Sequence, residues 1–377
     1  MGLRDKVLNI LVLNYEFPPI GGGAGVVAYD ISKRLAEAGH QVTVVTMGFE
    51  QLPAYEEKDG MRIYRVKCIR KKKAVCYPWE QLSYILSAVH FLRRHMKENH
   101  YDINHTHFII PTGPISYWLK KKYGLEYVIT SHGSDVAGYN QKRFKFLHKI
   151  LIGPWRVIVQ NAREVISPSL YLKDLLEKSG PGLKKYPIIP NGIELETYLP
   201  LKSREKKNHV IVMCRLQEAK NVQTVIRGFA RFVSKTEYKD WHLDILGDGP
   251  YKEVLENLAK ELGINDKVQF HGWVPNRSEK QLKLLGQAKI YVSASTFENC
   301  PMSVLEALAA GVYPLVSDIP AHRQILPVEN QLFETNDVVR LSEKLTEAAL
   351  LTDWSLPLDI SAYDWKAVMQ KYEEILQ

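Results

Sequence analysis

The sequence predicts an α/β fold with two doubly wound domains, each a parallel sheet covered by helices. The chain has 377 residues, which is long for a single hydrophobic core. Patterns typical of buried strands alternate with amphipathic helical patterns, and this alternation favours parallel sheets. The alternation of strands and helices begins again after residues 188–210, a charged segment without periodicity that resembles a linker.

In the first half, strands are expected at 7–14, 41–47, 61–67, 101–108 and 126–133. Helical patterns cover 25–39, which Gly39 closes, and 78–100. In the second half, strands are expected at 209–216, 241–246, 267–271, 289–293 and 312–316. Helices are expected at 221–234, 250–262, 278–286, 302–310 and 364–376.

These patterns predict an N-terminal domain at 1–195, a C-terminal domain at 196–358 and a final helical segment at 359–377 that crosses back to the N-terminal domain. Open parallel sheets bind ligands outside the carboxyl ends of their strands. We therefore expect the two domains to face each other across a ligand-binding cleft.

Composition indicates an ordinary globular protein, with 45% hydrophobic and 24% charged residues. No apolar run reaches the length of a membrane-spanning helix. The four cysteines lack both a disulfide framework and metal-ligand spacing, so a cytoplasmic location is expected.

The basic excess lies in the first half of the chain. Residues 1–200 carry 28 basic and 18 acidic side chains, whereas the formal net charge of the whole chain is +8. The excess gathers at 61–73, at 120–122 and at Lys142, Arg143, Lys145 and Lys149. Such a surface attracts an anionic membrane, an acidic substrate or nucleic acid, and a merely solvated surface is an equal alternative. A peripheral position on the inner face of the cytoplasmic membrane is consistent with this charge.

The segment FENCPMSVLEALAAG (297–311) holds two glutamates eight positions apart, Glu298 and Glu306. They are open to three interpretations: a hydrolytic acid–base pair, two contacts to one ligand, or surface charges. Eight helical steps rise about 12 Å, whereas glycosidase carboxylates lie about 5–9.5 Å apart. A loop before the helix can shorten this distance, but the spacing favours two contacts on an elongated ligand, with phosphates at the helix N-terminus between them.

The segment PPIGGGAGVVAYD sets Gly21, Gly22 and Gly23 between a strand and a helix. Glycines there allow close approach of a phosphate or sugar, although the segment is neither GxGxxG nor a P-loop, and a purely structural turn is an equal alternative. His132 and Asp135 lie at the end of a later predicted strand, where such folds place chemistry, although a structural role is an equal alternative for His132. His105 and His107 share a strand face without an evident third metal ligand, so a structural role is favoured for them.

Two cations flank the start of a helix in the second half. Arg215 follows a strand and Lys220 precedes the helix, an arrangement that suits a diphosphate, with surface charges as the alternative. Gly247 lies in LGDGP, another strand-to-helix turn that requires glycine.

The chain resembles the retaining glycosyltransferases of family 4, which have the GT-B fold of two facing Rossmann-like domains. The resemblance covers nearly the whole sequence. It is carried by the glycine loop and by SHGSD, SPSLYLKDLL, IPNGIE, RLQEAKN, LGDGP, VQFHGWV and the E-x7-E segment, in this order.

The resemblance implies transfer of a hexose from a nucleoside diphosphate sugar, with a UDP-sugar favoured and GDP-mannose next, to a glycan or lipid-linked acceptor. It implies no cofactor, no nucleic-acid partner and, because the chain has no DxD motif, no catalytic metal. The implied catalytic residues are His132, Arg215, Lys220 and Glu298. The implied donor-binding residues are Gly21, Gly22, Gly23 and Gly247, Val274 beside the base, Glu298 at the sugar, Met302 and Ser303 at the phosphates, and Glu306 at the ribose; Asp135 lies on the acceptor side.

The chain departs from the family pattern at three positions. Pro301 replaces a glycine and lacks an N–H, Tyr313 replaces a common proline, and Gln324 replaces a common glutamate. These changes bear on donor specificity. The competing functions are a nucleotide-sugar epimerase or phosphorylase of the same fold and a non-catalytic nucleotide-sugar or membrane-binding module. The E-x7-E segment, the chain length and the presence of both halves of a site argue against them.

Overall fold

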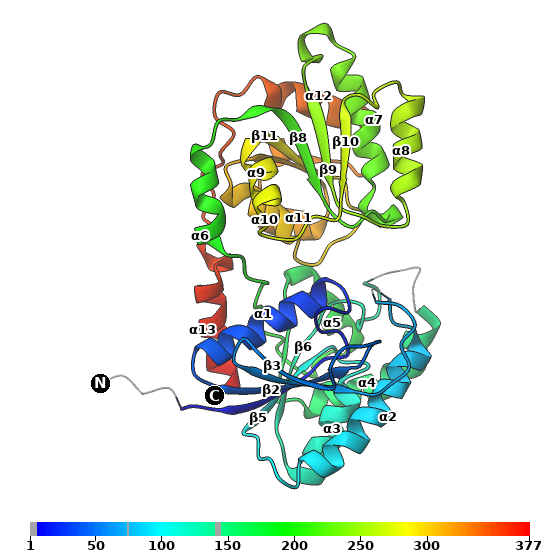
Figure 1. The fold of residues 1–377 in the computed structure, drawn as a ribbon, viewed down its shortest axis with the longest axis vertical. Helices are drawn as coiled ribbons and strands as arrows, with labels where there is room; N and C mark the ends of the chain where they lie inside the picture. The colour runs from blue at the N-terminus through cyan, green and yellow to red at the C-terminus, as the bar shows by residue number, and fades with distance from the viewer. Residues whose placement is uncertain (1–5, 74, 140–144) are drawn as a thin grey trace, which may run out of the picture. The chain divides into compact units, whose positions relative to one another are not determined.

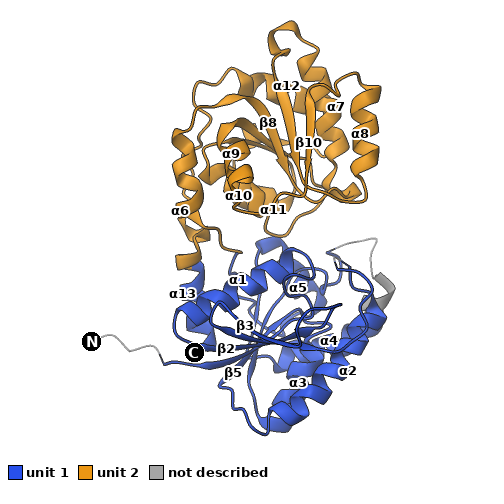
Figure 2. Cartoon of the chain, viewed as in Figure 1, with its two compact units in different colours: residues 1–190, 368–377 blue, residues 191–367 orange. Residues whose placement is uncertain are grey.

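The computed structural model describes residues 6–73, 75–139 and 145–377, with the side chains of 145–149 excluded. The chain forms two compact units (Figures 1 and 2). Unit 1 comprises residues 1–190 and 368–377, and unit 2 comprises 191–367. Each unit is a mostly parallel sheet covered by helices, so the predicted pair of Rossmann-like α/β domains is confirmed. The divisions fall at 190/191 and 367/368, whereas the sequence suggested 195/196 and 358/359.

The sheet of unit 1 has seven strands in the order β3-β4-β2-β1-β5-β6-β7. All neighbours are parallel except β3 and β4, which pair antiparallel at one edge. The strands are β1 (Asn9–Leu13), β2 (Gln41–Met47), β3 (Tyr55–Lys58), β4 (Met61–Val66), β5 (Ile103–His107), β6 (Tyr127–Thr130) and β7 (Glu164–Ile166). The covering helices are α1 (Gly23–Glu37), α2 (Pro78–His95), α3 (Gly113–Tyr123), α4 (Lys145–Asn161), α5 (Leu170–Ser179) and most of α13 (Trp365–Leu376).

The sheet of unit 2 is parallel throughout, in the order β10-β9-β8-β11-β12-β13. Its strands are β8 (Lys207–Met213), β9 (His242–Leu246), β10 (Val268–Gly272), β11 (Ala288–Ser293), β12 (Tyr313–Ser317) and β13 (Leu332–Phe333). Its helices are α6 (Leu195–Tyr198), α7 (Val222–Val233), α8 (Lys252–Glu261), α9 (Glu279–Gln287), α10 (Met302–Ala309), α11 (Pro320–Ile325) and α12 (Val338–Ala349). Short 3₁₀ turns, η1 (Leu199–Ser203) to η5 (Ser361–Tyr363), join several of them.

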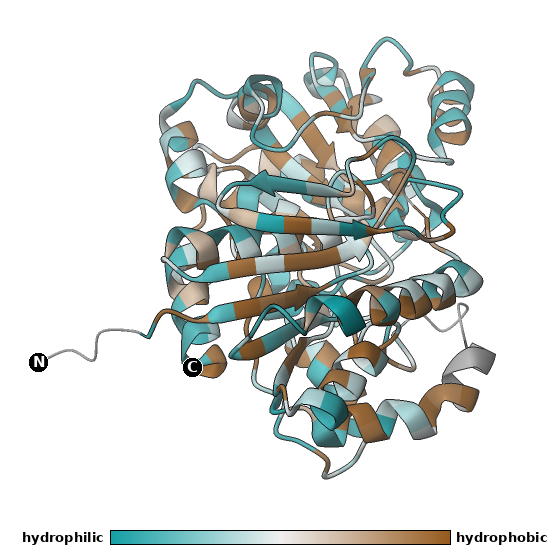
Figure 3. Cartoon of the chain, turned by 60° about the horizontal axis from the view of Figure 1, so that its bottom comes forward, coloured by the Kyte–Doolittle hydropathy of each residue, from teal (hydrophilic) through white to brown (hydrophobic). Residues whose placement is uncertain are grey.

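Apolar strands form the centre of each unit. In Figure 3 hydrophobic stretches run along several of the strands, whereas the helices alternate hydrophobic and hydrophilic residues along their length. On one side of the sheet of unit 2, Val210, Ile245 and Val292 pack with Phe229 of α7. Val304 and Leu308 of α10 pack with Ile211 on the other side. Neighbouring strand residues therefore pack on opposite faces of the sheet, and helices cover both faces.

The structure differs from the sequence expectation at several elements. The edge strand β3 has the sequence YEEK and is largely exposed, so it lacks the apolar alternation by which strands are recognised. The expected linker at 188–210 contains α6 and η1, and β8 begins inside it. Lys142 and Arg143 lie outside the described residues, as do the side chains of Lys145 and Lys149. Among the described helices, none is both long enough and apolar enough to cross a bilayer.

Candidate functional site

The centre of unit 2 is a topological switch point. From β8 the chain continues to β9 and β10 on one side of the sheet, and β11 then pairs with β8 on the other side. Loops diverge at such a point and leave room for a ligand at the carboxyl ends of the strands. Lys220 follows β8, and Glu298 follows β11.

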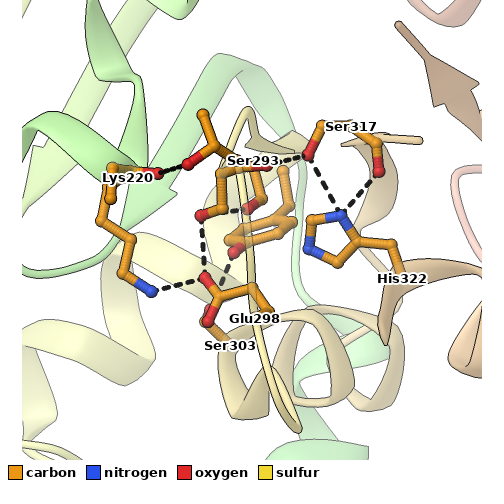
Figure 4. A network of polar contacts seen from close by, with 10 residues as sticks. Lys220, Ser293, Glu298, Ser303, Ser317 and His322 are labelled. Atoms are coloured by element: carbon orange, nitrogen blue, oxygen red, sulfur yellow. Dashed lines mark hydrogen bonds and ion pairs between the residues drawn. The ribbon is translucent and has the colours of Figure 1, made fainter. Parts of the chain in front are cut away.

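Lys220 and Glu298 form an ion pair at this switch point (Figure 4). Lys220 Nζ donates to Glu298 Oε1 over 2.5 Å, and Ser295 Oγ donates to the same oxygen over 2.8 Å. The Lys220 side chain is 25% exposed and that of Glu298 17% exposed. The loops are joined by the backbone as well, because Thr296 N donates to Ala219 O over 2.9 Å.

Glu298 stays ionised in this environment. Burial raises the pKa of its carboxyl group, but attraction to Lys220 and hydrogen bonds from Lys220 and Ser295 outweigh burial, so the net pKa is lowered. The carboxylate is therefore a fixed negative charge and hydrogen-bond acceptor at the end of β11.

A serine–histidine network that no sequence motif indicates supports the Glu298 loop. Ser317 Oγ donates to Ser295 O over 2.5 Å, and His322 Nδ1 donates to Ser317 O over 2.7 Å. Burial lowers the pKa of His322, so the ring is neutral, with Nδ1 protonated toward the carbonyl oxygen. The sequence did not indicate this network, because Ser317 ends β12 and His322 follows it, whereas Ser295 follows β11.

Helix α10 begins beside Glu298. Pro301 is its N-cap residue, so the missing N–H falls before the first helical residue. Met302 and Ser303 form the first turn, whose amides have no carbonyl partners within the helix. Ser303 Oγ and Tyr291 OH lie 2.8 Å apart, and this contact ties the turn to β11.

Glu306 lies further along α10 in a buried position, only 8% exposed. Gln281 Nε2 donates to its Oε2 over 3.3 Å, and Tyr198 also makes a side-chain hydrogen bond to the carboxyl group. Burial raises its pKa to about 6 despite these bonds and the attraction of Arg277. The two glutamates therefore differ: Lys220 holds Glu298 ionised, whereas Glu306 is costly to ionise.

Three further candidates follow strands β8, β9 and β10 of unit 2. Arg215 follows β8 and is exposed. Gly247 follows β9 at φ +149°, and a Cβ there would lie 1.8 Å from Cys214 O, so this close approach of two loops requires glycine. Val274 follows β10, is half-buried and packs against the apolar cluster around α10.

Unit 1 carries the remaining candidates. Gly21 has φ +96°, and a Cβ there would lie 2.5 Å from the Cβ of Glu16. Gly22 N donates to Glu16 Oε2 over 3.1 Å, so a carboxylate of the chain already contacts the loop that was predicted to receive phosphate or sugar. Gly23 begins α1, and a Cβ there would meet open space.

His132 lies in a group of rings at the ends of β5 and β6. Its Nε2 is 3.0 Å from Nδ1 of His107, and its ring packs on Phe108. His105 and His107 are fully buried, and His105 Nε2 contacts Thr130 Oγ1 at 2.9 Å, which agrees with a structural role. Burial, with a smaller contribution from His105, lowers the pKa of His132 to about 3, so this ring is neutral.

The Asp135 carboxylate organises the loop after β6. Its Oδ1 accepts from Ser131 Oγ, His132 N and Gly133 N, and its Oδ2 accepts from Ile109 N. Burial raises its pKa although these hydrogen bonds favour the ionised form. Asp135 therefore fixes the backbone beside His132. Among the described residues, no group of three or more His, Cys, Asp or Glu side chains is arranged to hold a metal ion.

Solved structures that share this fold are GT-B glycosyltransferases. Sucrose-phosphate synthase from Thermosynechococcus elongatus aligns over 98% of both chains, with a TM-score of 0.79 and 18% identity. Anabaena HepE, in complex with UDP and glucose, aligns over 98% of this chain and 99% of its own, with a TM-score of 0.72 and 16% identity. The fold is therefore GT-B.

Two family models match consecutive parts of the sequence. Glycosyltransferase Family 4 matches residues 21–197, and Glycosyl transferases group 1 matches residues 200–364. Together the two models cover nearly the whole chain. The chain therefore belongs to glycosyltransferase family 4 and is a glycosyltransferase.

Curated relatives agree with this membership. The chain is 26% identical over 314 residues to N-acetyl-alpha-D-glucosaminyl L-malate synthase of Bacillus anthracis, covering 78% of this chain and 75% of the relative. It is 27% identical over 312 residues to alpha-monoglucosyldiacylglycerol synthase of Streptococcus pneumoniae, covering 78% of this chain and 67% of the relative.

Proposed function

We propose that this glycosyltransferase moves a hexose from a nucleoside diphosphate sugar to a glycan or lipid-linked acceptor, with retention of configuration and without a metal. Unit 2 binds the donor, with a UDP-sugar favoured and GDP-mannose next. Unit 1 binds the acceptor on the side of Asp135, and the basic surface of unit 1 associates with an anionic membrane.

The Lys220–Glu298 ion pair carries this proposal. A cation and an ionised carboxylate meet where the strand order of unit 2 reverses, which is the usual ligand position in a doubly wound sheet. Lys220 and the exposed Arg215 supply positive charge for a diphosphate. Glu298 supplies an acceptor for sugar hydroxyl groups.

The first turn of α10 and Glu306 extend this arrangement. Helix N-terminal amides favour phosphate, and α10 begins directly after the Glu298 loop. The Glu306 carboxylate is an acceptor suited to the hydroxyls of a ribose. One elongated ligand, with a sugar at one end and a nucleoside at the other, accounts for both glutamates.

The chemistry requires stabilisation of a leaving diphosphate. Fixed cations lower the free energy of the negative charge that develops on the leaving oxygen. The leaving phosphate can itself assist deprotonation of the acceptor hydroxyl on the same face of the sugar, so retention needs no separate base. The acylglycerol named in the streptococcal relative supports a lipid-linked acceptor here.

A donor panel tests the proposal. The purified protein is incubated without acceptor with UDP-glucose, UDP-N-acetylglucosamine, UDP-galactose and GDP-mannose, and release of nucleoside diphosphate is followed. We expect slow hydrolysis of one donor, with the α-anomer of the sugar released first. EDTA should leave the rate unchanged. Release of the β-anomer would contradict retention, and EDTA inhibition that Mg²⁺ or Mn²⁺ reverses would contradict metal independence.

Two substitutions test the site assignment with the preferred donor. Lys220→Ala and Glu298→Gln should each lower the rate about 10²–10³-fold, the effect of removing one electrostatic contact to a transition state. Lys260→Ala and Glu253→Gln, at exposed positions of α8, serve as matched controls and should retain the wild-type rate. Wild-type turnover in either site variant, with circular dichroism unchanged, would refute the assignment.

A further inference from the structure

Helix α2 in unit 1 presents a row of exposed apolar side chains. Trp79, Leu82 and Leu86 are 55%, 57% and 65% exposed. Their spacing of three and four residues places them on one face of the helix. The row therefore forms a continuous apolar strip along the outer side of α2.

This strip is not required for folding, because the opposite side of α2 already packs on the core. Tyr84, Ala88 and Leu92 are fully buried, and Tyr84 OH donates to Val45 O of β2 over 2.9 Å. A helix anchored in this way has no structural need for leucines and a tryptophan facing water. A contiguous exposed apolar strip indicates an interaction surface.

The same row becomes cationic toward the end of the helix. Arg93 lies seven residues after Leu86 and is exposed, and Lys97, in the turn that follows the helix, is exposed too. Glu80 is the only carboxylate in α2; it is fully buried and accepts from the backbone amides of Tyr77 and Lys71. The exposed side of α2 itself thus combines apolar and positively charged side chains and has no negative charge, and the nearest acidic side chain after the helix is the exposed Glu98.

The loop before α2 adds further cations beside the apolar strip. Lys71, Lys72 and Lys73 are all exposed. Arg70 holds their backbone, donating to Lys72 O over 3.1 Å and to Lys73 O over 3.0 Å. The three lysine side chains therefore extend from a fixed segment rather than from a loose loop.

Ile69 joins this loop to the apolar strip. It is 57% exposed, and its amide donates to Ser83 Oγ of α2 over 2.9 Å. Trp79 stacks on Tyr77 with ring centroids 4.7 Å apart and an interplanar angle of 4°. Aromatic rings with a polar edge favour the boundary between lipid and water.

We propose that these residues form a docking surface for an anionic lipid bilayer. The surface, called the α2 face, comprises Ile69, Lys71, Lys72, Lys73, Trp79, Leu82, Leu86, Arg93 and Lys97. The inference deepens the proposed lipid-linked acceptor and membrane association and rests on that part of the proposed function. It identifies the elements that contact the lipid.

The chemistry of the α2 face favours a bilayer over an acidic protein. An amphipathic helix binds lipid when its apolar side enters the acyl boundary and cations flank it at the headgroup level. The α2 face combines apolar residues and cations in this way on a helix of 18 residues, a length of about 27 Å. Such a helix can lie in the plane of the interface.

Vesicle co-sedimentation of the full chain tests this surface, using phosphatidylcholine vesicles with and without phosphatidylglycerol. We expect binding to the anionic vesicles and much weaker binding to the neutral ones. Raising the ionic strength to about 1 M, where the screening length is about 3 Å, should reduce binding. Equal binding to neutral vesicles, or no binding to anionic vesicles at low salt, would overturn the proposal.

Paired variants locate the surface. Trp79→Ser with Leu86→Ser should weaken vesicle binding at least about tenfold, and Lys71→Glu with Lys72→Glu should weaken it about tenfold or more. Val254→Ser with Leu350→Ser is the matched control, because these side chains of unit 2 are 52% and 73% exposed.

The variants distinguish lipid binding through the α2 face from self-association and from lipid binding elsewhere on the chain. Loss of binding in the two α2-face variants and retention in the control support the proposal. Vesicle binding that persists in the Trp79→Ser, Leu86→Ser variant would refute the proposal. It would also be refuted if the wild-type protein bound no vesicles but formed a dimer that this variant abolished. Circular dichroism confirms folding, and Leu82→Ser alone provides a second test if the double variant unfolds. Donor hydrolysis without vesicles tests the proposed function independently.

Discussion

Replacing Glu306 by glutamine tests whether this carboxylate is kept for ligand binding at a cost in stability. Glu306 is 8% exposed, and burial raises its pKa from 4.5 to about 6. The variant removes the charge while keeping the shape and an oxygen that can accept from Gln281 or Tyr198. We therefore expect glutamine to favour folding at neutral pH and to weaken donor binding.

The size of the effect follows from the pKa shift. A shift of about 1.5 units corresponds to about 2 kcal/mol. A carboxyl group with a raised pKa stabilises the folded state below the unfolded pKa of 4.5, and this contribution is lost as the pH rises through about 6. The free energy of unfolding of Glu306→Gln, relative to that of the wild type, should therefore rise by about 2 kcal/mol from acidic to alkaline pH. About 1.3 kcal/mol of this rise should fall between pH ~5 and ~8.

Urea unfolding followed by tryptophan fluorescence measures this gain at several pH values. The relevant quantity is the difference in free energy of unfolding between variant and wild type, because other titrating groups cancel in it. Glu253→Gln, at an exposed position of α8, is the control and should show no comparable change with pH.

A pH-independent difference, or a gain that grows toward acid, would refute the reasoning about Glu306. Donor kinetics provide the second readout, since loss of the carboxylate should raise the KM for the nucleotide sugar. Greater stability together with weaker donor binding is the pattern of a residue retained for function. An unchanged KM would remove Glu306 from the proposed donor site.

Two further substitutions test the loops that surround the candidate residues. Gly247→Ala should lower the free energy of unfolding by about 2–4 kcal/mol, because its Cβ would collide with the Cys214 carbonyl. The control Gly263→Ala, at φ +65° with no atom within 4 Å of its Cβ, should lower it by only about 1–2 kcal/mol in urea unfolding. Equal losses would contradict the argument that Gly247 is required by the close approach of two loops. Asp135→Asn should lower the free energy of unfolding by about 1–3 kcal/mol, because one side-chain oxygen cannot replace two that accept from four donors. Asp174→Asn, on the exposed side of α5, is its control. A similar small effect in both variants would contradict the positioning role of Asp135.

The fold was largely predictable because its elements have strong periodicity. The pattern at 41–47 matches β2 in full, and the helix expected at 302–310 is α10 at Met302–Ala309. The misses were elements without an apolar pattern. Edge strand β3 is polar and largely exposed, and α6 lies in a charged segment that indicates a linker. In both, tertiary contacts rather than local sequence determine the conformation.

The candidate site was only partly predictable. From sequence, a predicted helix start indicated Lys220, the spacing of two glutamates indicated Glu298, and a strand-to-helix turn indicated Gly247. Family resemblance supplied their proposed roles. His322 and Ser317 were missed because their contacts to the Glu298 loop involve positions distant in the chain. The placement of Asp135 on the acceptor side stays a prediction. Its four hydrogen bonds give it in addition a positioning role that no spacing rule indicates.

The sequence by itself determined the alternation of strands and helices, the division into two α/β units and membership of the family, because these depend on local periodicity and on the order of motifs. Only the tertiary structure decided how the two glutamates of 297–311 differ. Glu298 is ionised beside a lysine 78 positions away in the sequence, whereas burial raises the pKa of Glu306. Electrostatic energies depend on neighbours in space and on exclusion of water, and both exist only once distant segments have packed together.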